Sequence, residues 1–171
     1  MGPVNAELAI DVPREVAFDF IADLAHRPVF TDHFISDFHL LRVESTGVGA
    51  GARFRFTAPP QAIWMDTSIV ELRRPQRISE RGHGGRWNRI PSATEWELLA
   101  GPGRLTTVRV TYWTDSGHPL DRLKEVLGAA SVWYGRDWAA ALRRLRDLLE
   151  SQQPDAEAPG VAGGEHTMPV H

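Results

Sequence analysis

The sequence contains no cysteine and no surplus of basic residues. Without cysteine the chain has no disulfide, no thiolate nucleophile and no sulfur-ligated zinc site. Its 22 acidic and 19 basic residues are well mixed and give a formal net charge of −3, so no basic face of the kind that holds a nucleic acid backbone is indicated. A composition of 42% hydrophobic and 24% charged residues over 171 positions is typical of one globular domain. We expect no nucleic acid partner.

Long apolar runs are also missing. No stretch approaches the ~18 consecutive apolar residues that span a membrane. The first residues, "MGPVNAELAIDVPREVAFDF", carry acids and prolines where a signal peptide needs a basic start and an unbroken apolar run. We therefore expect a cytoplasmic protein without stable membrane insertion, and a monomer or weak dimer.

Three histidines lie close together in the sequence but do not form a metal-ligand pattern. The spacings between His26, His33 and His39 are seven and six, and they include Pro28 and an expected change from helix to strand. Metal sites need tighter and more regular spacing. We expect no metal and no other cofactor.

The chain begins with one strand and two short helices. "AELAIDV" alternates apolar and acidic residues, which predicts a half-buried strand over 6–12. Pro13 ends that strand and suits the first turn of a short amphipathic helix in "PREVAFDFIADL". "AHRPVFTDHF", broken by Pro28, predicts a second short helix or a turn.

From Ile35 onward the sequence consists of β-forming segments separated by turn residues. Short connections that contain glycine or proline join the segments, which favours an antiparallel meander over alternating strands and helices. The six expected strands cover 38–45, 52–58, 62–72, 77–82, 93–99 and 104–114.

The last part of the chain contains a predicted long helix followed by a segment with few large apolar residues. Between Pro119 and Glu150, apolar residues recur at steps of three and four, which predicts one long amphipathic helix. Residues 151–171 contain no Leu, Ile, Phe, Trp or Tyr, so they cannot bury enough surface to offset the entropy of ordering. We expect residues 1–150 to form one ligand-binding domain and 151–171 a disordered tail.

This order of elements predicts an α+β domain. A curved antiparallel sheet of about seven strands must cover its apolar face, and the long C-terminal helix is the largest partner available. A sheet wrapped around one helix leaves a space near the first half of that helix, where the two N-terminal helices would close the mouth. Such a space is by default a ligand pocket.

Several motifs resemble the START-like, or SRPBCC, superfamily of polyketide cyclase/dehydrase and lipid-transport proteins, which is related in fold to the major birch-pollen allergen. The first is "VPREVAFDFIADLAHRPVF", and the others, in the right order, are "GVGAGARFRF", "IVELRRPQRI", "WELLAGPGRLTTVRV" and "WYGRDWAAALRRLRDLLE". The resemblance implies a helix-grip fold with a cavity for an apolar or aromatic small molecule. It implies no catalytic motif, because members on this scaffold serve many functions.

Alternation along the strands predicts which side chains face the cavity. Phe54 and Phe56 are expected inward between outward arginines, and Val108, Val110 and Tyr112 inward on the last strand. In "ATEWELL" the same rule places Thr94, Trp96 and Leu98 inward and leaves Glu95 and Glu97 in solvent.

The strand over 62–72 has two possible registers. We favour the face with Ile63, Met65, Thr67 and Ile69 inward because it is the more apolar set, which leaves Asp66 solvated. A bulge near Val70 would return Leu72 to the core, whereas the opposite register would place Trp64 and Asp66 in the pocket.

Glu80 has the same parity as Ile78 and is therefore expected inward, where the family usually has an apolar residue. It is either a polar anchor or general acid/base in the pocket, or the end of a strand whose carboxylate reaches solvent or a neighbouring arginine. His83 has the opposite parity and lies in a glycine-rich stretch, so we expect a loop histidine and no acid/base pair with Glu80.

Aromatic side chains dominate the expected cavity lining, with core packing as the alternative. The candidate catalytic groups are Glu80 and Tyr112. The candidate ligand-binding residues are Phe30, Phe34, Phe54, Phe56, Met65, Glu80, Trp96, Val110, Tyr112, Trp133 and Tyr134.

The sequence is compatible with three hypotheses about function. The leading hypothesis is a binding protein or carrier for an apolar, aromatic or lipid-like small molecule. The second is a cyclase or dehydratase acting on a polyketide-like substrate, with Glu80 and Tyr112 moving protons. The third is a regulatory module that binds a partner through the tail and surface arginines.

Overall fold

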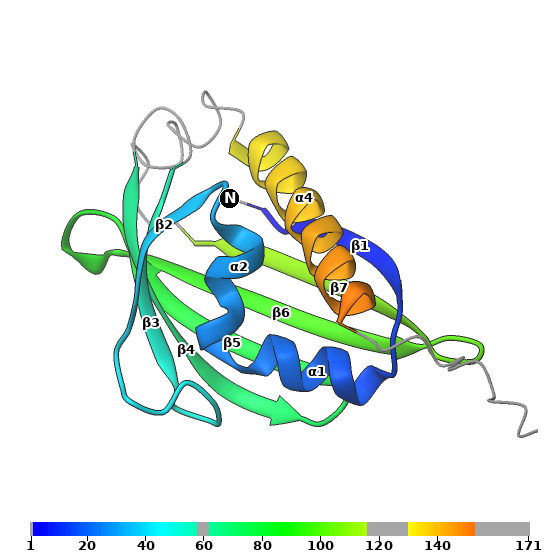
Figure 1. Ribbon diagram of the computed structural model, residues 1–171. Coiled ribbons are helices and arrows are strands. Elements are labelled where there is room, and N and C mark those ends of the chain that lie inside the picture. The colour runs from blue at the N-terminus through cyan, green and yellow to red at the C-terminus, as the bar shows by residue number, and fades with distance from the viewer. Residues whose placement is uncertain (1, 58–61, 116–129, 153–171) are drawn as a thin grey trace, which may run out of the picture.

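One antiparallel sheet and one long helix dominate the computed structural model, which describes residues 2–57, 62–115 and 130–152 (Figure 1). The architecture is α+β with a helix-grip arrangement, as the sequence predicts. The strands are β1 (Val4–Asp11), β2 (Ile35–Leu40), β3 (Gly51–Phe56), β4 (Ile63–Arg73), β5 (Arg77–Gly84), β6 (Ile90–Ala100) and β7 (Leu105–Thr114). The helices are α1 (Arg14–Ala22), η1 (Leu24–His26), α2 (Arg27–Thr31), η2 (Arg86–Asn88) and α4 (Ala130–Ser151).

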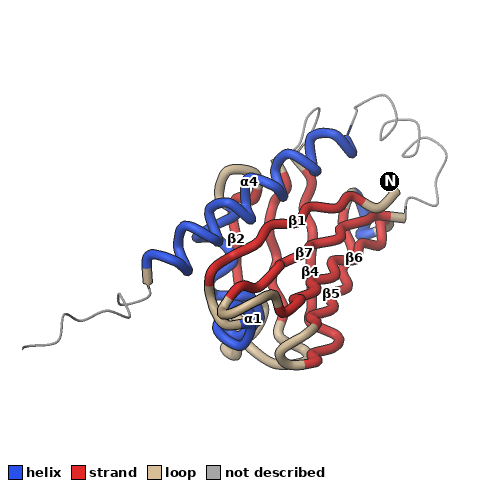
Figure 2. The backbone as a smooth tube through the Cα atoms, turned by 90° about the vertical axis from the view of Figure 1, so that its right-hand side faces the viewer, coloured by secondary structure: helices blue, strands red, loops and turns tan. Residues whose placement is uncertain are grey.

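The sheet is a meander that the first strand completes. Its order is β1-β7-β6-β5-β4-β3-β2, and each neighbouring pair is antiparallel. The sheet curls so that α4 lies across its concave face, while α1 and α2 cover the remaining part of that face (Figures 1 and 2). No helix among the described residues is long and apolar enough to cross a membrane.

Strand alternation places the core side chains as predicted. Phe54 and Phe56 are buried between the exposed Arg53 and Arg55. Val108, Val110 and Tyr112 are also buried, and so are Thr94, Trp96 and Leu98. Phe56, Trp96 and Tyr112 contact aromatic rings of α4, and the apolar stripe of this helix includes Trp138, Leu142 and Leu145, which are at most 2% exposed.

The favoured register of β4 is confirmed, together with its bulge. Met65, Thr67 and Ile69 are buried, whereas Trp64 is 41% exposed on the other face. The pairing with β5 shifts between Ile69 and Glu71, so Val70 is an extra residue and Leu72 packs against the core. The outward Asp66 lies 3.7 Å from the Nε atom of Arg53.

Turn and cap residues set the short helices in place. Pro13 precedes α1 at φ −57°, a value that proline favours. The Asp23 side chain accepts a hydrogen bond from the Ala25 amide at 2.9 Å and caps η1. Pro28 lies in the first turn of α2, where its missing amide proton costs nothing.

Some boundaries differ from the predicted ones. The second strand begins at Ile35 and ends at Leu40, and His83 lies inside β5 rather than in a loop. The strand β5 runs two residues further than predicted because its backbone continues to pair with β6 through Gly84. The predicted helical residues 119–129 and most of the predicted tail lie outside the described residues.

Candidate functional site

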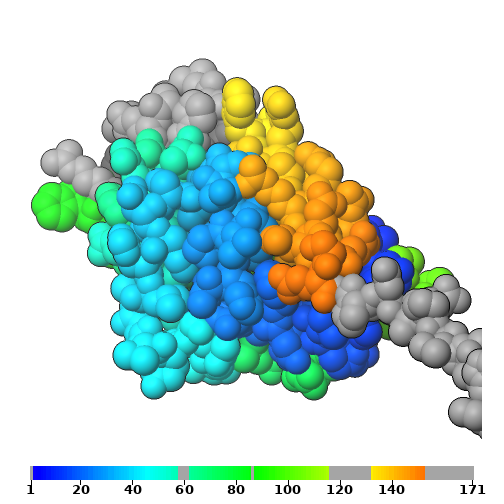
Figure 3. Space-filling model, viewed as in Figure 1, coloured from blue at the N-terminus to red at the C-terminus, as the bar shows by residue number. Residues whose placement is uncertain are grey.

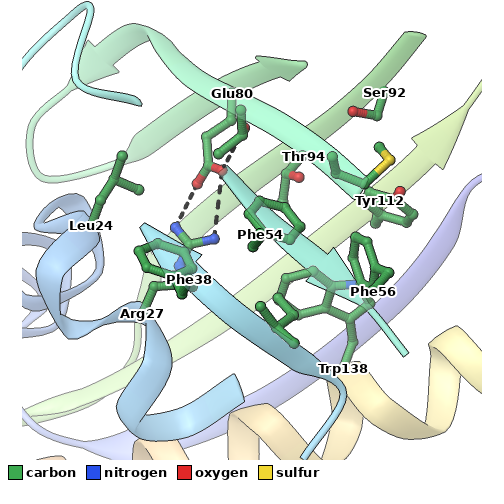
Figure 4. A pocket seen from close by; sticks show the side chains of 13 residues that line it. Leu24, Arg27, Phe38, Phe54, Phe56, Glu80, Ser92, Thr94, Tyr112 and Trp138 are labelled. Atoms are coloured by element: carbon green, nitrogen blue, oxygen red, sulfur yellow. Dashed lines mark hydrogen bonds and ion pairs between the residues drawn. The ribbon is translucent and has the colours of Figure 1, made fainter. Parts of the chain in front are cut away.

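Glu80 is buried in the interior and fully engaged by hydrogen-bond donors. Its side chain, on β5, is 1% exposed. The carboxylate atom Oε1 accepts from Arg27 Nη2 at 2.6 Å and from Trp96 Nε1 at 2.9 Å. Its Oε2 accepts from Thr67 Oγ1 at 3.2 Å and from Arg27 Nη1 at 3.5 Å (Figure 4). The predicted inward direction of Glu80 is confirmed, and of the alternatives the pairing with an arginine is present, whereas β5 does not end at Glu80 and its carboxylate does not reach solvent.

Arg27 brings the opposite charge from α2. Arg27 is 4% exposed, and its guanidinium lies 5.0 Å from the centre of the Trp96 ring and 5.9 Å from that of the Phe30 ring. Arg27, Phe30 and Thr31 are all buried, because positions i, i+3 and i+4 share one face of a helix. Thr31 Oγ1 donates to the Arg27 carbonyl at 2.7 Å and holds this turn.

Two buried donors beside this ion pair have no acceptor among the described residues. They are Arg27 Nε and Trp138 Nε1. An unpaired buried donor costs free energy in proportion to its lost hydration. The interior thus offers hydrogen bonds to an oxygen acceptor in addition to apolar surface.

A pocket between the sheet, α2 and α4 contains these groups. Phe38, Phe54, Phe56, Tyr112 and Trp138 supply its aromatic lining. Its polar lining comes from Arg27, Thr67, Glu80, Ser92 and Thr94. In Figure 4, Glu80, Thr94 and Ser92 lie on one side, with Phe56 and Trp138 on the other.

The pocket is nearly filled by its own side chains. Its open volume is about 10 Å³, the space of roughly one water molecule. Pockets for drug-sized ligands measure about 300–1,000 Å³. A larger guest therefore requires lining side chains to move.

The predicted site residues divide into three groups. Phe54, Phe56, Met65, Glu80 and Tyr112 line the pocket. Five others are buried in the surrounding core without lining it, namely Phe30, Phe34, Trp96, Val110 and Tyr134.

Trp133 is wrong as a lining residue. It is 43% exposed on α4, and the Arg136 guanidinium lies 5.6 Å from its ring centre. The stripe that packs on the sheet instead includes Tyr134 and Trp138, four residues apart. Trp133, one position before Tyr134, therefore falls on the outer side of the helix.

The histidines occupy separate environments. His26 stacks on Phe20 with ring centres 4.3 Å apart, and His33 Nε2 donates to the Asp137 carbonyl at 3.0 Å. His39 and His83 are exposed on strands. His83 faces away from Glu80, as its parity predicts.

The sequence analysis missed Arg27 and Trp138. The signal for Arg27 was present, because an inward Phe30 places the residue three positions earlier on the same helical face. Trp138 belongs to the recognised stripe of the long helix, but its unpaired indole proton depends on neighbours from other elements.

For Glu95, the predicted outward direction is confirmed, but the predicted exposure to solvent is wrong. It points to the outer face of the sheet but is only 7% exposed. Ser79 Oγ donates to it, and so do Arg77 at 3.2 Å and Arg81 at 2.6 Å. Burial favours the neutral acid, but these hydrogen bonds outweigh it and hold the pKa of Glu95 below its usual value.

Comparison of the sequence with protein families matches residues 11–150 to the model described as activator of Hsp90 ATPase homolog 1-like protein. The chain belongs to this family. It is thereby placed in the START-like, SRPBCC superfamily that the motifs indicated. No curated protein matches the sequence.

Solved structures share this START-like fold across nearly the whole domain. TTHA0849 from Thermus thermophilus matches with a TM-score of 0.68 and 15% identity, covering 90% of this chain and 100% of that one. A START superfamily protein from Mycobacterium smegmatis matches with a TM-score of 0.61 and 11% identity, covering 88% and 99%. DynU16, a putative protein in the dynemicin biosynthetic locus, matches with a TM-score of 0.60 and 18% identity, covering 89% and 48%. At these identities the likeness concerns the fold.

Proposed function

We propose that the protein binds an apolar, aromatic or lipid-like small molecule between its sheet and α4. The observation that carries this proposal is the buried Arg27–Glu80 pair inside an aromatic pocket. A buried ion pair is weak support for stability, since apolar residues of similar volume often serve as well. A role in orienting a ligand accounts for its place in the pocket wall.

The unpaired donors suggest what the ligand carries at its polar end. Arg27 Nε and Trp138 Nε1 each lack an acceptor among the described residues. An aromatic body with a carbonyl or hydroxyl oxygen would bury its rings against Phe56 and Tyr112 and accept a hydrogen bond from one of these donors. The fold family, which includes ligand-binding proteins, is consistent with such a guest.

A fluorescent aromatic ketone, prodan, tests the proposal. We expect saturable binding with a blue shift of its emission. Phe54→Ala removes a side chain from the filled pocket and should tighten binding, whereas Thr94→Phe should occupy the remaining space and weaken it at least tenfold. Thr111→Phe, which adds the same ring on the outer face of β7, is the matched control and should leave binding unchanged.

Two outcomes contradict binding in this pocket. One is an absence of prodan binding to both the parent chain and Phe54→Ala. The other is equal loss of binding in Thr94→Phe and Thr111→Phe. Thermal unfolding of each variant establishes that it is folded before binding is compared.

The alternative is an enzyme of the cyclase or dehydratase type, with Glu80 and Tyr112 as proton-handling groups. Both residues line the pocket. However, each oxygen of Glu80 already accepts hydrogen bonds from two side chains. Proton abstraction by Glu80 would first require one of these bonds to break, so the geometry favours a binding role. Turnover of a polyketide-like substrate that Glu80→Gln abolishes, with binding retained, would reverse this preference.

A further inference from the structure

Tryptophan is distributed unevenly between the interior and the surface. All six tryptophans lie in the described residues, and two of them, Trp96 and Trp138, are buried. Trp64 is 41% exposed and Trp87 is 77% exposed, while Trp113 is half-buried. Single exposed apolar residues are ordinary, but a group of large ones needs an explanation.

Three of these residues share one end of the sheet. Because neighbouring strands are antiparallel, the start of β4, the turn between β5 and β6, and the end of β7 lie at the same end. The Gly85 amide donates to the Trp64 carbonyl at 3.0 Å, which joins the turn to β4. Trp113 pairs with Ala93 in the adjoining strands. We call Trp64, Trp87 and Trp113 the tryptophan end.

The backbone holds Trp87 outward at the tip of this end. Trp87 has φ +68° and Asn88 has φ +51°, a left-handed conformation that residues other than glycine rarely adopt. The turn projects beyond the body of the molecule, in green at the left of Figures 1 and 3. The turn thus combines two consecutive left-handed residues with a tryptophan that is 77% exposed.

The segment that forms the tip is basic, and the nearest acid is Asp66 of β4, which accepts a hydrogen bond from Asn88 at 3.5 Å. Residues 81–94 contain Arg81, Arg86 and Arg89 together with His83, and no acidic residue. Arg53 lies 5.4 Å from the ring centre of Trp64 and Arg81 lies 5.3 Å from that of Trp113, but both are paired with acids, Arg53 with Asp66 and Arg81 with Glu95, so the positive charge of the tip comes from its own segment. The chain as a whole is acidic, with a formal net charge of −3, so this basic segment is a local exception.

We propose that the tryptophan end docks on an anionic phospholipid surface, with Trp87 entering the interface. Tryptophan is enriched at the headgroup level of membranes, and nearby arginines are attracted to anionic lipids. A narrow projecting tip suits insertion between headgroups, whereas a specific protein partner needs about 800 Å² of matching surface on each side. Docking would bring the membrane beside Met65 and Ser92, which line the pocket from β4 and β6.

Cosedimentation of the full chain with vesicles tests this surface. We expect binding to phosphatidylcholine vesicles that contain phosphatidylglycerol, and much weaker binding to pure phosphatidylcholine. Removing two positive charges in Arg86→Gln/Arg89→Gln should weaken binding roughly 25-fold, about fivefold for each arginine. Trp87→Ser should weaken binding to anionic vesicles at least fivefold and remove the blue shift of tryptophan fluorescence.

Val43→Ser provides the matched control. Val43 is 95% exposed in the connection between β2 and β3, at the opposite end of the sheet, and its loss should leave vesicle binding unchanged. Equal loss of binding in Val43→Ser and Trp87→Ser overturns the proposal. So does the absence of binding to anionic vesicles, or binding to single-stranded DNA or an acidic peptide in place of vesicles. Prodan binding, measured without vesicles, tests the pocket separately.

Discussion

Arg27 and Glu80 come from positions 53 residues apart and neutralise each other inside the protein. Removal of one partner leaves the other as an unpaired buried charge, which typically costs about 3–5 kcal/mol. We expect Arg27→Met and Glu80→Gln each to lower the free energy of unfolding by this amount in urea titrations. The double variant should lose much less than the sum, since it buries no unpaired charge.

Arg74 and Asp19 provide a control for this cycle. They form an ion pair of similar length, 2.7 Å, but both side chains are more than half exposed. Water solvates each charge when its partner is removed, so Arg74→Met and Asp19→Asn should change stability far less. Strictly additive losses in the Arg27 and Glu80 cycle would show that the buried pair is not energetically coupled.

Glu95 makes stability depend on pH. Its pKa is below the ordinary value of 4.5 because hydrogen bonds from Ser79, Arg81 and Arg77 outweigh the effect of burial. The folded state therefore binds this proton less readily than the unfolded chain, and the carboxylate stabilises the fold fully above pH 4.5. That contribution disappears as the pH falls from there through the lower, folded-state pKa.

Glu95→Gln should expose this dependence in thermal unfolding. At neutral pH the parent chain should be more stable than the variant, and the difference should shrink as the pH falls below 4.5. A gap in melting temperature that stays constant from neutral to acidic pH would assign the stability to packing rather than to the charge.

In β5, two glycines leave no room for a larger side chain. A Cβ atom on Gly82 would overlap the Asp66 carbonyl, and one on Gly84 would overlap the end of the Met65 side chain. Glycine inside a strand often marks such close approach. The flexible methionine can move, whereas the backbone carbonyl of β4 cannot do so without disturbing the ladder.

Gly82→Ala should therefore destabilise the protein more than Gly84→Ala. Overpacking of a core commonly costs about 1–3 kcal/mol, and we expect Gly84→Ala within this range and Gly82→Ala above it in urea unfolding. Gly2→Ala is the control, because nothing lies within 4 Å of the added methyl group. A greater loss in Gly84→Ala would reverse the proposed order of constraint.

Local periodicity predicted the strands well for a physical reason. Alternation depends only on the backbone, so Phe54, Trp96 and Val110 could be placed inward from sequence alone. Burial depends on partners from other strands. Glu95 is covered by Ser79 and two arginines of β5, and no pattern within its own strand records this.

The packing of the domain extends to the last turn of α4. Leu149 is 2% exposed, and Glu150 Oε1 accepts a hydrogen bond from the Asp11 amide at 3.0 Å. A chain that ends at Gln152 should keep its free energy of unfolding, because the removed residues 153–171 include no large apolar residue except Met168 and two valines. A chain that ends at Leu148 should lose about 2–5 kcal/mol, the usual cost of deleting a buried leucine side chain.

The measurement is the free energy of unfolding of the three chain lengths. A large loss on removal of residues 153–171 would contradict the proposal that these residues form a tail outside the domain. An unchanged stability after removal of Leu149 and Glu150 would contradict their contribution to the core.

The global arrangement was predictable, but the detail of the pocket was not. The order of elements and the motifs led to the helix-grip fold and to an inward Glu80. The pairing with Arg27 and the small open volume arise from how a curved sheet, α2 and α4 meet, and these distances depend on all of the elements at once.

The bulge at Val70 also determines where a residue can be deleted from β4 without turning core side chains outward. Val70 is 47% exposed and stands between Ile69, which pairs with Glu80, and Glu71, which pairs with Ser79. Deleting a residue elsewhere in a strand reverses the facing of every residue beyond it. Deleting Val70 would leave Ile69 and Leu72 inward and Glu71 outward, with a regular ladder between them. The bulge is thus a point inside the sheet where a single-codon deletion conserves the division between core and surface.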